Sequence, residues 1–347
     1  MIKQHSPEWL EAKKSRVGAS EIAGLVHYYC KDELKALKID FEPYNTALQT
    51  WAKVKFGIEL PFPKSISRWG LGMEEYIADR FNREQSQILA KRTDDFVINN
   101  DLMGCSPDGY VNIKNRLPEQ PLCKIQDFDK QVVIDNTWGN GTLELKTTSF
   151  NQSSDFRDGF KWHYIFQMQH QMMCCLTNWG VGVVLIPKDP WEAEELEKGY
   201  ILGKMEDKDY NKSGIDDLFF LEHFVYAKKP KLVELINVAL NKFKSDLDNN
   251  ILPMPYSGTK QTLLANEKQV LAMLHPTRFG EVIADEVQDG LLSEMKILQA
   301  EKKKVECEEM EARNKVMHAI GDAIALIGTD YKAKFDSRMS LRFSKIK

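Results

Sequence analysis

The sequence predicts an α/β fold followed by a helical extension. Between Leu71 and Ile186 the hydrophobic periodicity predicts, in order, a helix, three strands, a helix and a strand. From about Gly258 the chain becomes rich in Glu, Lys, Ala and Leu, which is typical of long helices. We therefore expect an α/β domain over residues 1–255, with an insertion at about 113–140, and a C-terminal helical extension over 256–347.

The composition excludes several classes of protein. The 347 residues are 43% hydrophobic, which suffices for one large domain, and the net charge of -4 leaves DNA binding to local basic patches. The N-terminus lacks the apolar stretch of a signal peptide, and the most apolar run, Val181 to Ile186, is too short to span a bilayer. Six cysteines without a CxxC pair indicate buried thiols in a reducing cytoplasm.

The N-terminal third reads as short helices separated by turns. "RVGASEIAGLV" predicts a turn into a helix with Ser20 near its start. "PYNTALQTWAKVKFG" predicts a second helix, capped by Asn45 or Thr46 and stopped by Gly57. After a proline-rich loop, a third helix is expected from about Leu71 to Arg83.

The strands follow. "QILAKRTDDFVIN" predicts a strand with a turn inside it, and "LMGCSPDGYVNI" a strand broken at Ser-Pro-Asp-Gly. The polar segment from Asn115 to Asn140, with the strand-like run "KQVVI", reads as a surface insertion. The strand "GTLELKT", the helix "WHYIFQMQHQMMCCL" and the buried strand "GVGVVLI" complete the domain. The tail predicts a long helix before a hairpin in "DYKAKFDSRMSLRFSKI".

One strand combines an acid and an amine. In "GTLELKT", Glu144 and Lys146 share one face and the leucines share the other. A lone pair of this kind is most simply an ion pair. Asp108, in the preceding "SPDG" turn, adds a second carboxylate at an adjacent strand end. Two carboxylates suit magnesium, which takes oxygen ligands, and a nearby lysine can position or deprotonate the attacking water.

The helix "GLGMEEYIADRF" supplies a third carboxylate. The positions three, four and seven residues after Glu74 are apolar, whereas those after Glu75 include polar residues. Glu74 is therefore expected on the buried face and Glu75 on the exposed one. A buried carboxylate needs a partner, which could be a metal or a salt bridge to Arg80 or Arg83.

The later helix carries a polar stripe beside its apolar one. Tyr164, Gln167 and Gln171 follow each other at helical spacing. A glutamine at a core margin can bind a phosphate oxygen or a metal-bound water. A satisfied interior amide explains the stripe equally well.

Together these motifs resemble the PD-(D/E)xK nuclease superfamily, whose core is restriction-endonuclease-like, and within it the lambda exonuclease and YqaJ viral recombinase family. The matching pieces, in family order from Trp9 to Ile186, are "EWLEAKKSRVGASEIA", "RWGLGMEEYIADRF", "GCSPDGYV", "TLELKTTS" and "YIFQMQHQMMCCLT". Each piece alone is a weak signal, but the combination is specific. The resemblance implies a mixed central sheet flanked by helices, which agrees with the predicted order of elements.

The resemblance also implies roles for individual residues. The metal would be bound by three carboxylates and one backbone carbonyl, next to a catalytic lysine and a glutamine. In this sequence these positions are Glu74, Asp108, Glu144, the carbonyl of Leu145, Lys146 and Gln167.

A second set would hold the 5′-phosphate of a DNA end. Ser20 and Ser106 align with the family's phosphate-binding residues. The family's arginine is replaced by Lys13, and Arg16 lies nearby as a substitute. Lysine cannot grip a phosphate in bidentate fashion as arginine does, so end recognition is expected to be weaker or rearranged. The insertion before Glu144 is longer than in the lambda enzyme, and the tail is more similar to YqaJ-type proteins.

The function implied by the resemblance is Mg²⁺-dependent digestion of double-stranded DNA from free 5′ ends, with Mn²⁺ able to substitute, leaving 3′ overhangs. The implied setting is phage-type recombination with a single-strand annealing protein, in the cytoplasm of a bacterial host, by a ring-shaped homotrimer without membrane contact. The alternatives are an endonuclease or structure-specific nuclease using the same site, and a non-catalytic DNA-binding protein on a nuclease fold. The complete Asp, Glu and Lys set argues against the last. The long tail helix could also dock a partner.

Overall fold

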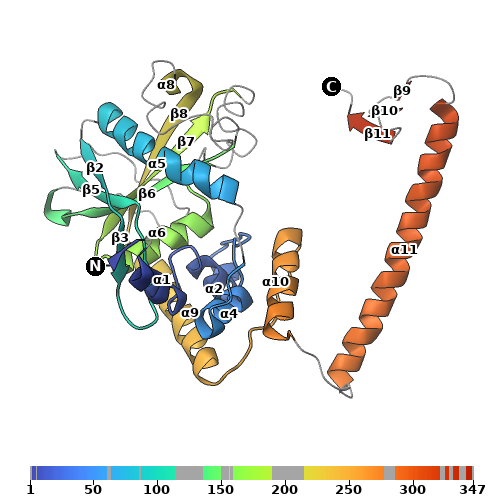
Figure 1. The fold of residues 1–347 in the computed structure, drawn as a ribbon, viewed down its shortest axis with the longest axis horizontal. Coiled ribbons are helices and arrows are strands. Elements are labelled where there is room, and N and C mark those ends of the chain that lie inside the picture. The colour runs from blue at the N-terminus through green and yellow to red at the C-terminus, as the bar shows by residue number, and fades with distance from the viewer. Residues whose placement is uncertain are drawn as a thin grey trace. The chain divides into compact units, whose positions relative to one another are not determined.

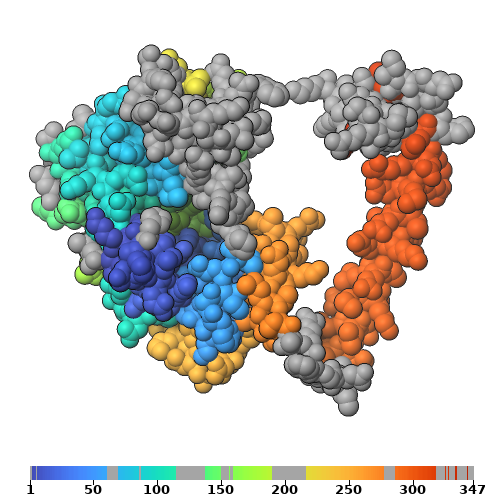
Figure 2. All heavy atoms as spheres, viewed as in Figure 1, coloured from blue at the N-terminus to red at the C-terminus, as the bar shows by residue number. Residues whose placement is uncertain are grey.

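The fold is that of a computed structural model, which describes residues 2–4, 6–60, 64–85, 87–114, 136–149, 156, 159–189, 215–276, 286–320, 325–327, 331–335 and 341–345. The chain divides into two compact units, Met1–Pro276 and Thr277–Lys347. Helix α10 (Gln261–Leu274) belongs to the first unit and lies beside helix α4 (Ala47–Phe56) (Figure 1 and Figure 2). Its Val270 packs with Leu48 and Ala52 of α4.

A five-stranded mixed sheet forms the centre of the first unit (Figure 1). Its order is β2 (Ile88–Arg92), β5 (Gly109–Ile113), β6 (Gly141–Thr147), β7 (Trp179–Pro187) and β8 (Phe219–Ala227). Strands β6 and β7 are parallel, and the other neighbours are antiparallel. The predicted mixed sheet is confirmed.

Helices cover both faces of this sheet. Leu143 and Leu145 of β6 pack with Met73 and Ile77 of helix α5 (Lys64–Glu84). The opposite face is covered by α6 (Trp162–Cys174), which packs with α2 (Ile22–Tyr29) and α9 (Pro230–Asp248) in a second hydrophobic cluster. The order α5, β2, β5, β6, α6, β7 is the predicted helix, three strands, helix and strand.

A second, small sheet interrupts that order. It consists of β1 (Ile2–Lys3), β3 (Asp95–Ile98) and β4 (Gly104–Cys105). Each of the two strand segments predicted to contain a turn breaks there, and its halves join different sheets. A parallel bridge between Val17 and Met103 connects β4 to the N-terminal segment.

The N-terminal helices are α1 (Pro7–Lys14), α2, α3 (Lys31–Ala36) and α4. Thr46, not Asn45, caps α4 through a reciprocal capping box with Gln49, and Gly57 ends it with a φ of 67°. Helix α5 begins at Lys64, earlier than the predicted Leu71. Ser20 precedes α2 within a turn and is not its N-cap residue, which is Glu21.

The second unit contains helix α11 (Glu286–Ile320) and strands β9 (Ala325–Ile327), β10 (Tyr331–Phe335) and β11 (Leu341–Lys345). Strands β10 and β11 form the predicted hairpin, and β9 joins β10. Charged pairs four residues apart, such as Lys315 with Glu311, support the long helix.

Two short elements complete the described chain: the 3₁₀ turn η1 (Asn136–Trp138) and helix α8 (Ile215–Leu218). Most of the predicted insertion, including "KQVVI", lies outside the described residues. Among the helices that the structure describes, none is long and apolar enough to cross a membrane.

Candidate active site

The end of strand β6 brings the predicted acids together. The ladder between β5 and β6 ends at Leu143, so the chain before β5 diverges from β6 beyond this point. Asp108 lies at this divergence, and its Oδ2 accepts a hydrogen bond of 2.7 Å from the N–H of Leu145. Glu144 and Lys146 lie on the β6 face opposite the leucines. The structure therefore places the two carboxylates and the amine at adjacent strand ends.

Glu144 is the most enclosed of these groups, with a side chain only 1% exposed. Its Oε1 accepts hydrogen bonds from the Lys146 ammonium and, at 2.5 Å, from Nε2 of Gln167. Its Oε2 accepts a hydrogen bond of 2.5 Å from Nε2 of Gln171. The buried carboxylate is thus held by three donors. Because the ring of Tyr164 lies 5.2 Å from Lys146 Nζ, the whole polar stripe of α6 faces the site.

Gln171 was not expected to be a site residue. Its place on the stripe with Gln167 was visible in the sequence, but the resemblance gave a role to Gln167 alone. The signal that could have found it is the one-turn spacing of the two glutamines, which lets both reach the same carboxylate. The amides of Gln167 and Gln171 both donate to the buried Glu144, so they are satisfied interior amides within the candidate site.

Lys146 carries its charge in this arrangement. Burial disfavours the ammonium, but the carboxylates of Glu144 and Asp108 outweigh burial and raise the pKa of Lys146. The neighbouring carboxylates therefore favour the protonated form of the amine. In this arrangement it can neutralise charge and orient a neighbouring oxygen.

Helix α5 presents Glu74 as its periodicity predicts. The Glu74 side chain is 14% exposed, whereas Glu75 is exposed to solvent. Its ion-pair partner is Arg92, not Arg80 or Arg83, which bind other carboxylates. Burial raises the pKa of Glu74, and the Arg92 guanidinium opposes that rise.

Arg92 is a second residue that sequence analysis missed. It is the last residue of β2 and pairs in register with Gly109, which follows Asp108. A Cβ on Gly109 would lie 2.4 Å from the carbonyl oxygen of Lys91, so only glycine permits this close approach of the strands. Without the strand pairing, nothing in "QILAKRTDDF" distinguishes Arg92 from an ordinary surface cation.

The donor set fits a hard cation. As the side chains lie, no three His, Cys, Asp or Glu residues of the described chain form a metal-holding group. Each predicted carboxylate is instead bound by a protein donor. Nevertheless, Asp108 lies against the residue that follows Glu144, so the two carboxylates crowd one another. Burial, and after it the Glu144 carboxylate, raise the pKa of Asp108 well above its usual range. Crowded carboxylate oxygens are the ligands that Mg²⁺ takes.

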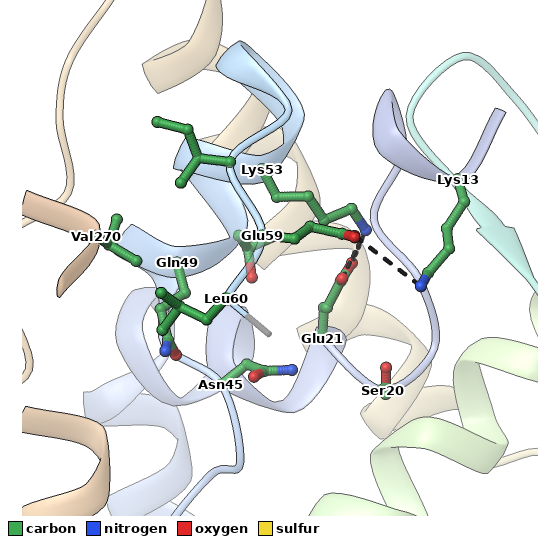
Figure 3. A pocket seen from close by; sticks show the side chains of 11 residues that line it. Lys13, Ser20, Glu21, Asn45, Gln49, Lys53, Glu59, Leu60 and Val270 are labelled. Atoms are coloured by element: carbon green, nitrogen blue, oxygen red, sulfur yellow. Dashed lines mark hydrogen bonds and ion pairs between the residues drawn. The ribbon is translucent and has the colours of Figure 1, made fainter. Parts of the chain in front are cut away.

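Ser20 and Lys13 line a separate pocket of about 560 Å³ (Figure 3). At its base the Lys53 ammonium binds both oxygens of Glu21, at 2.6 and 2.7 Å. The N–H of Gly18 donates to Glu21 Oε2 at 2.7 Å. This buried pair fixes the turn that carries Ser20 and neutralises the charge of Lys53.

The other two residues of the predicted phosphate set lie elsewhere. Neither Ser106 nor Arg16 lines this pocket. Arg16 donates to the carbonyl oxygens of Ala12 and Asn100, each at 3.1 Å. Lys13 is therefore the cation of the predicted set that reaches the pocket. Its Nζ lies 4.0 Å from a carboxylate oxygen of Glu59, and both side chains are partly exposed (Figure 3).

Solved structures and a sequence-family model resemble this chain. An alkaline exonuclease from Laribacter hongkongensis is 16% identical, with a TM-score of 0.42 over 77% of this chain and 100% of that one. A phage-related exonuclease from Haemophilus somnus is 12% identical, with a TM-score of 0.44 over 70% of this chain and 97% of that one. No curated protein sequence matches the chain. The sequence model of the YqaJ-like viral recombinase domain matches residues 8–178, a range that contains every predicted site residue. Residues 8–178 therefore form a YqaJ-like viral recombinase domain.

Proposed function

We propose that the protein is a metal-dependent DNA exonuclease of the phage-recombination type, which digests duplex DNA from 5′ ends and leaves 3′ overhangs. The observation that carries this proposal is the gathering of Asp108, Glu144 and Lys146 at one strand end of a YqaJ-like domain. Glu74 enters the same electrostatic cluster from helix α5.

In the proposed reaction, Glu74, Asp108, Glu144 and the carbonyl of Leu145 would hold Mg²⁺, for which Mn²⁺ could substitute. When bound, the ion would act as a Lewis acid toward the phosphoryl oxygen and would make a nearby water more acidic. The N–H of Leu145 fixes Asp108. Because the N–H and C=O of one strand residue point to the same neighbouring strand, the carbonyl of Leu145 is directed to the same edge.

The remaining residues of the site act on geometry and charge. Gln167 and Gln171 fix both oxygens of Glu144, so that this carboxylate keeps one orientation. Lys146, held between Glu144 and the ring of Tyr164, orients the attacking water and stabilises the charge that develops on the phosphate. We give Lys146 the catalytic role and the two glutamines a positioning role.

The DNA end is proposed to bind near Ser20, Lys13 and Ser106. Ser20 and Lys13 share the pocket shown in Figure 3. Ser106 follows Met103 by three residues, and Ser20 follows Val17 by three, after a bridge that joins Val17 and Met103 in parallel. The two chain segments run in the same direction at the bridge, so both serines lie beyond the same end of it. Arg16 lies next to this bridge and contributes positive charge rather than a pocket contact.

The biological setting is proposed on the family alone. The substrate would be double-stranded DNA with free ends, and the product would pass to a single-strand annealing protein. A homotrimer working in the cytoplasm of a bacterial host, of phage or prophage origin, fits this role. Size measurement in solution, with and without DNA, tests the oligomer.

The direct test of the function is digestion of linear and covalently closed circular duplexes in parallel. The linear substrate carries a label at the 5′ or the 3′ end and is incubated with Mg²⁺, Mn²⁺ or EDTA. We expect early release of the 5′ label from linear DNA, no attack on circles and no reaction in EDTA. Cleavage of circles at a comparable rate would support an endonuclease instead.

A further inference from the structure

The ion pair between Arg92 and Glu74 lies where the proposed metal must bind. Arg92 Nη2 donates to Oε2 of Glu74, so one carboxylate of the donor set is bound by an internal cation. Arg92 ends strand β2 opposite Gly109, directly beside Asp108. Neither the predicted metal ligands nor the predicted DNA contacts include this arginine.

The local charge shows what Arg92 does in the absence of metal. The cluster holds four carboxylates, those of Glu74, Asp108, Glu144 and Asp94, and the ammonium of Lys146. Arg92 adds a second positive charge and changes the net charge of the cluster from -3 to -2, counting each group as ionised. A divalent cation brought to the same carboxylates would therefore be repelled by Arg92 and would compete with it for Glu74.

Arg92 also keeps hydrogen-bonding capacity that Glu74 does not use. Its Nε is buried and has no hydrogen-bond partner within the described chain. The side chain is 30% exposed and lines a polar cleft of about 560 Å³, so the guanidinium is within reach of a ligand in solvent. The charged residues that line this cleft with it are Lys3, Lys91, Glu75, Asp79, Asp94 and Asp95. A guanidinium presents donors in a planar fork that suits two oxygens of one phosphate.

We propose that Arg92 occupies Glu74 in the metal-free enzyme, yields it to the divalent cation, and then donates to a phosphate oxygen of the bound DNA. This inference rests on the proposed metal-dependent nuclease function and adds a positioning residue to it. Without metal, the arginine offsets part of the negative charge of the carboxylates. When the metal displaces it from Glu74, its donors become free to bind the DNA backbone.

A purely structural ion pair makes the opposite prediction. If Arg92 only satisfied a buried acid, its removal would leave Glu74 without a partner and favour the protonated acid, which binds metal less well. If Arg92 competes with the metal, its removal tightens metal binding. The sign of the change in metal affinity separates the two roles.

The experiment is a titration of the 347-residue chain with Mn²⁺, without DNA, at pH 8, in which electron paramagnetic resonance measures the free ion. We expect Arg92→Gln to bind Mn²⁺ more tightly by on the order of tenfold. Its single-turnover cleavage of linear duplex at saturating metal should fall by on the order of tenfold or more, because the phosphate contact is lost.

Two further variants control for charge and for folding. Arg83 lies on α5, the helix that carries Glu74, but its ion-pair partner is Asp216. Arg83→Gln also removes one positive charge and should leave the Mn²⁺ affinity unchanged. Arg92→Lys keeps the charge but not the fork, so it should bind Mn²⁺ nearly as wild type does and still cleave more slowly. It also provides the test if Arg92→Gln fails to fold.

Suppose that wild-type protein binds Mn²⁺ and cleaves DNA, but that Arg92→Gln binds Mn²⁺ no more tightly than wild type. This result would overturn the proposed role of Arg92 and leave the nuclease function standing. Cleavage by Arg92→Lys at the wild-type rate would have the same consequence. Wild-type protein that neither binds Mn²⁺ nor cleaves DNA would overturn the nuclease function, and the inference about Arg92 with it.

Discussion

The side-chain amide of Gln171 donates a hydrogen bond of 2.5 Å to Oε2 of Glu144, from the buried face of helix α6. Gln167, one helical turn earlier, holds the other oxygen. One helix therefore fixes the orientation of the central acid of the site. Helix α6 therefore contributes to the proposed active site as well as covering the sheet.

Replacing Gln171 with leucine keeps much of the side-chain volume and removes the donor. We expect cleavage to fall by about 10–100-fold, the range measured when partners of metal ligands are removed. Gln169→Leu is the matched control, because Gln169 binds the backbone at Ala227 and Lys229 and does not touch Glu144. Thermal melts and initial rates of both variants give the comparison. If Gln171→Leu and Gln169→Leu lost the same activity for the same fall in melting temperature, Gln171 would be only a packing residue.

The two neighbouring glutamates of α5 should respond differently. We expect Glu74→Ala to weaken Mn²⁺ binding and cleavage by at least about tenfold, because it removes a buried oxygen ligand. Glu75→Ala should stay near wild type, since its side chain is exposed. Metal titration and digestion of the two variants side by side decide the matter. A larger effect at Glu75 would mean that the face assignment does not carry the function.

The pocket of Figure 3 predicts a preference for phosphorylated ends. Lys13→Ala and Ser20→Ala should reduce the rate on 5′-phosphorylated duplex more than on 5′-hydroxyl duplex. Arg16→Ala should reduce both rates alike, because its guanidinium binds backbone carbonyls outside the pocket. Competition between the two duplexes in one tube measures the preference. Wild-type protein that shows no preference would remove the basis for a phosphate pocket.

Acid stability should depend on Asp216. The hydrogen bond from the Tyr76 hydroxyl, at 2.6 Å, and the charge of Arg83 lower the pKa of Asp216. Since the folded pKa lies below the unfolded one, the stabilisation is present above the ordinary aspartate pKa of about 3.9 and is lost as the pH falls through the lowered value. Urea midpoints should therefore fall less for Asp216→Asn than for wild type between neutral and acidic pH. Parallel pH curves for the two proteins would contradict this.

The sequence predicted the elements of the domain better than their pairing. Helical and strand periodicity, a cap at Asn45 or Thr46 and a stop at Gly57 are local signals, and the structure has the cap at Thr46 and the stop at Gly57. The partition of two segments between the central and the small sheet was missed, because register depends on contacts between residues far apart in the chain.

The same limit explains the site. Glu74, Asp108, Glu144 and Lys146 were visible because local spacing and the family motif point to them. The partner of Glu74 was not, because Arg92 reaches it only through the pairing of β2 with β5. Gln171 lay between these cases, since its helical face was predicted but its contact with Glu144 needed the fold.

The most direct test of the active site is single-turnover cleavage of a 5′-phosphorylated linear duplex in Mg²⁺ by wild type and Lys146→Ala. The account predicts that the variant folds, binds the duplex with similar affinity and cleaves it slower by on the order of a hundredfold or more, because a group aimed at the reacting phosphate is lost. Cleavage by Lys146→Ala at the wild-type rate would contradict the assignment of Asp108, Glu144 and Lys146 as the catalytic site.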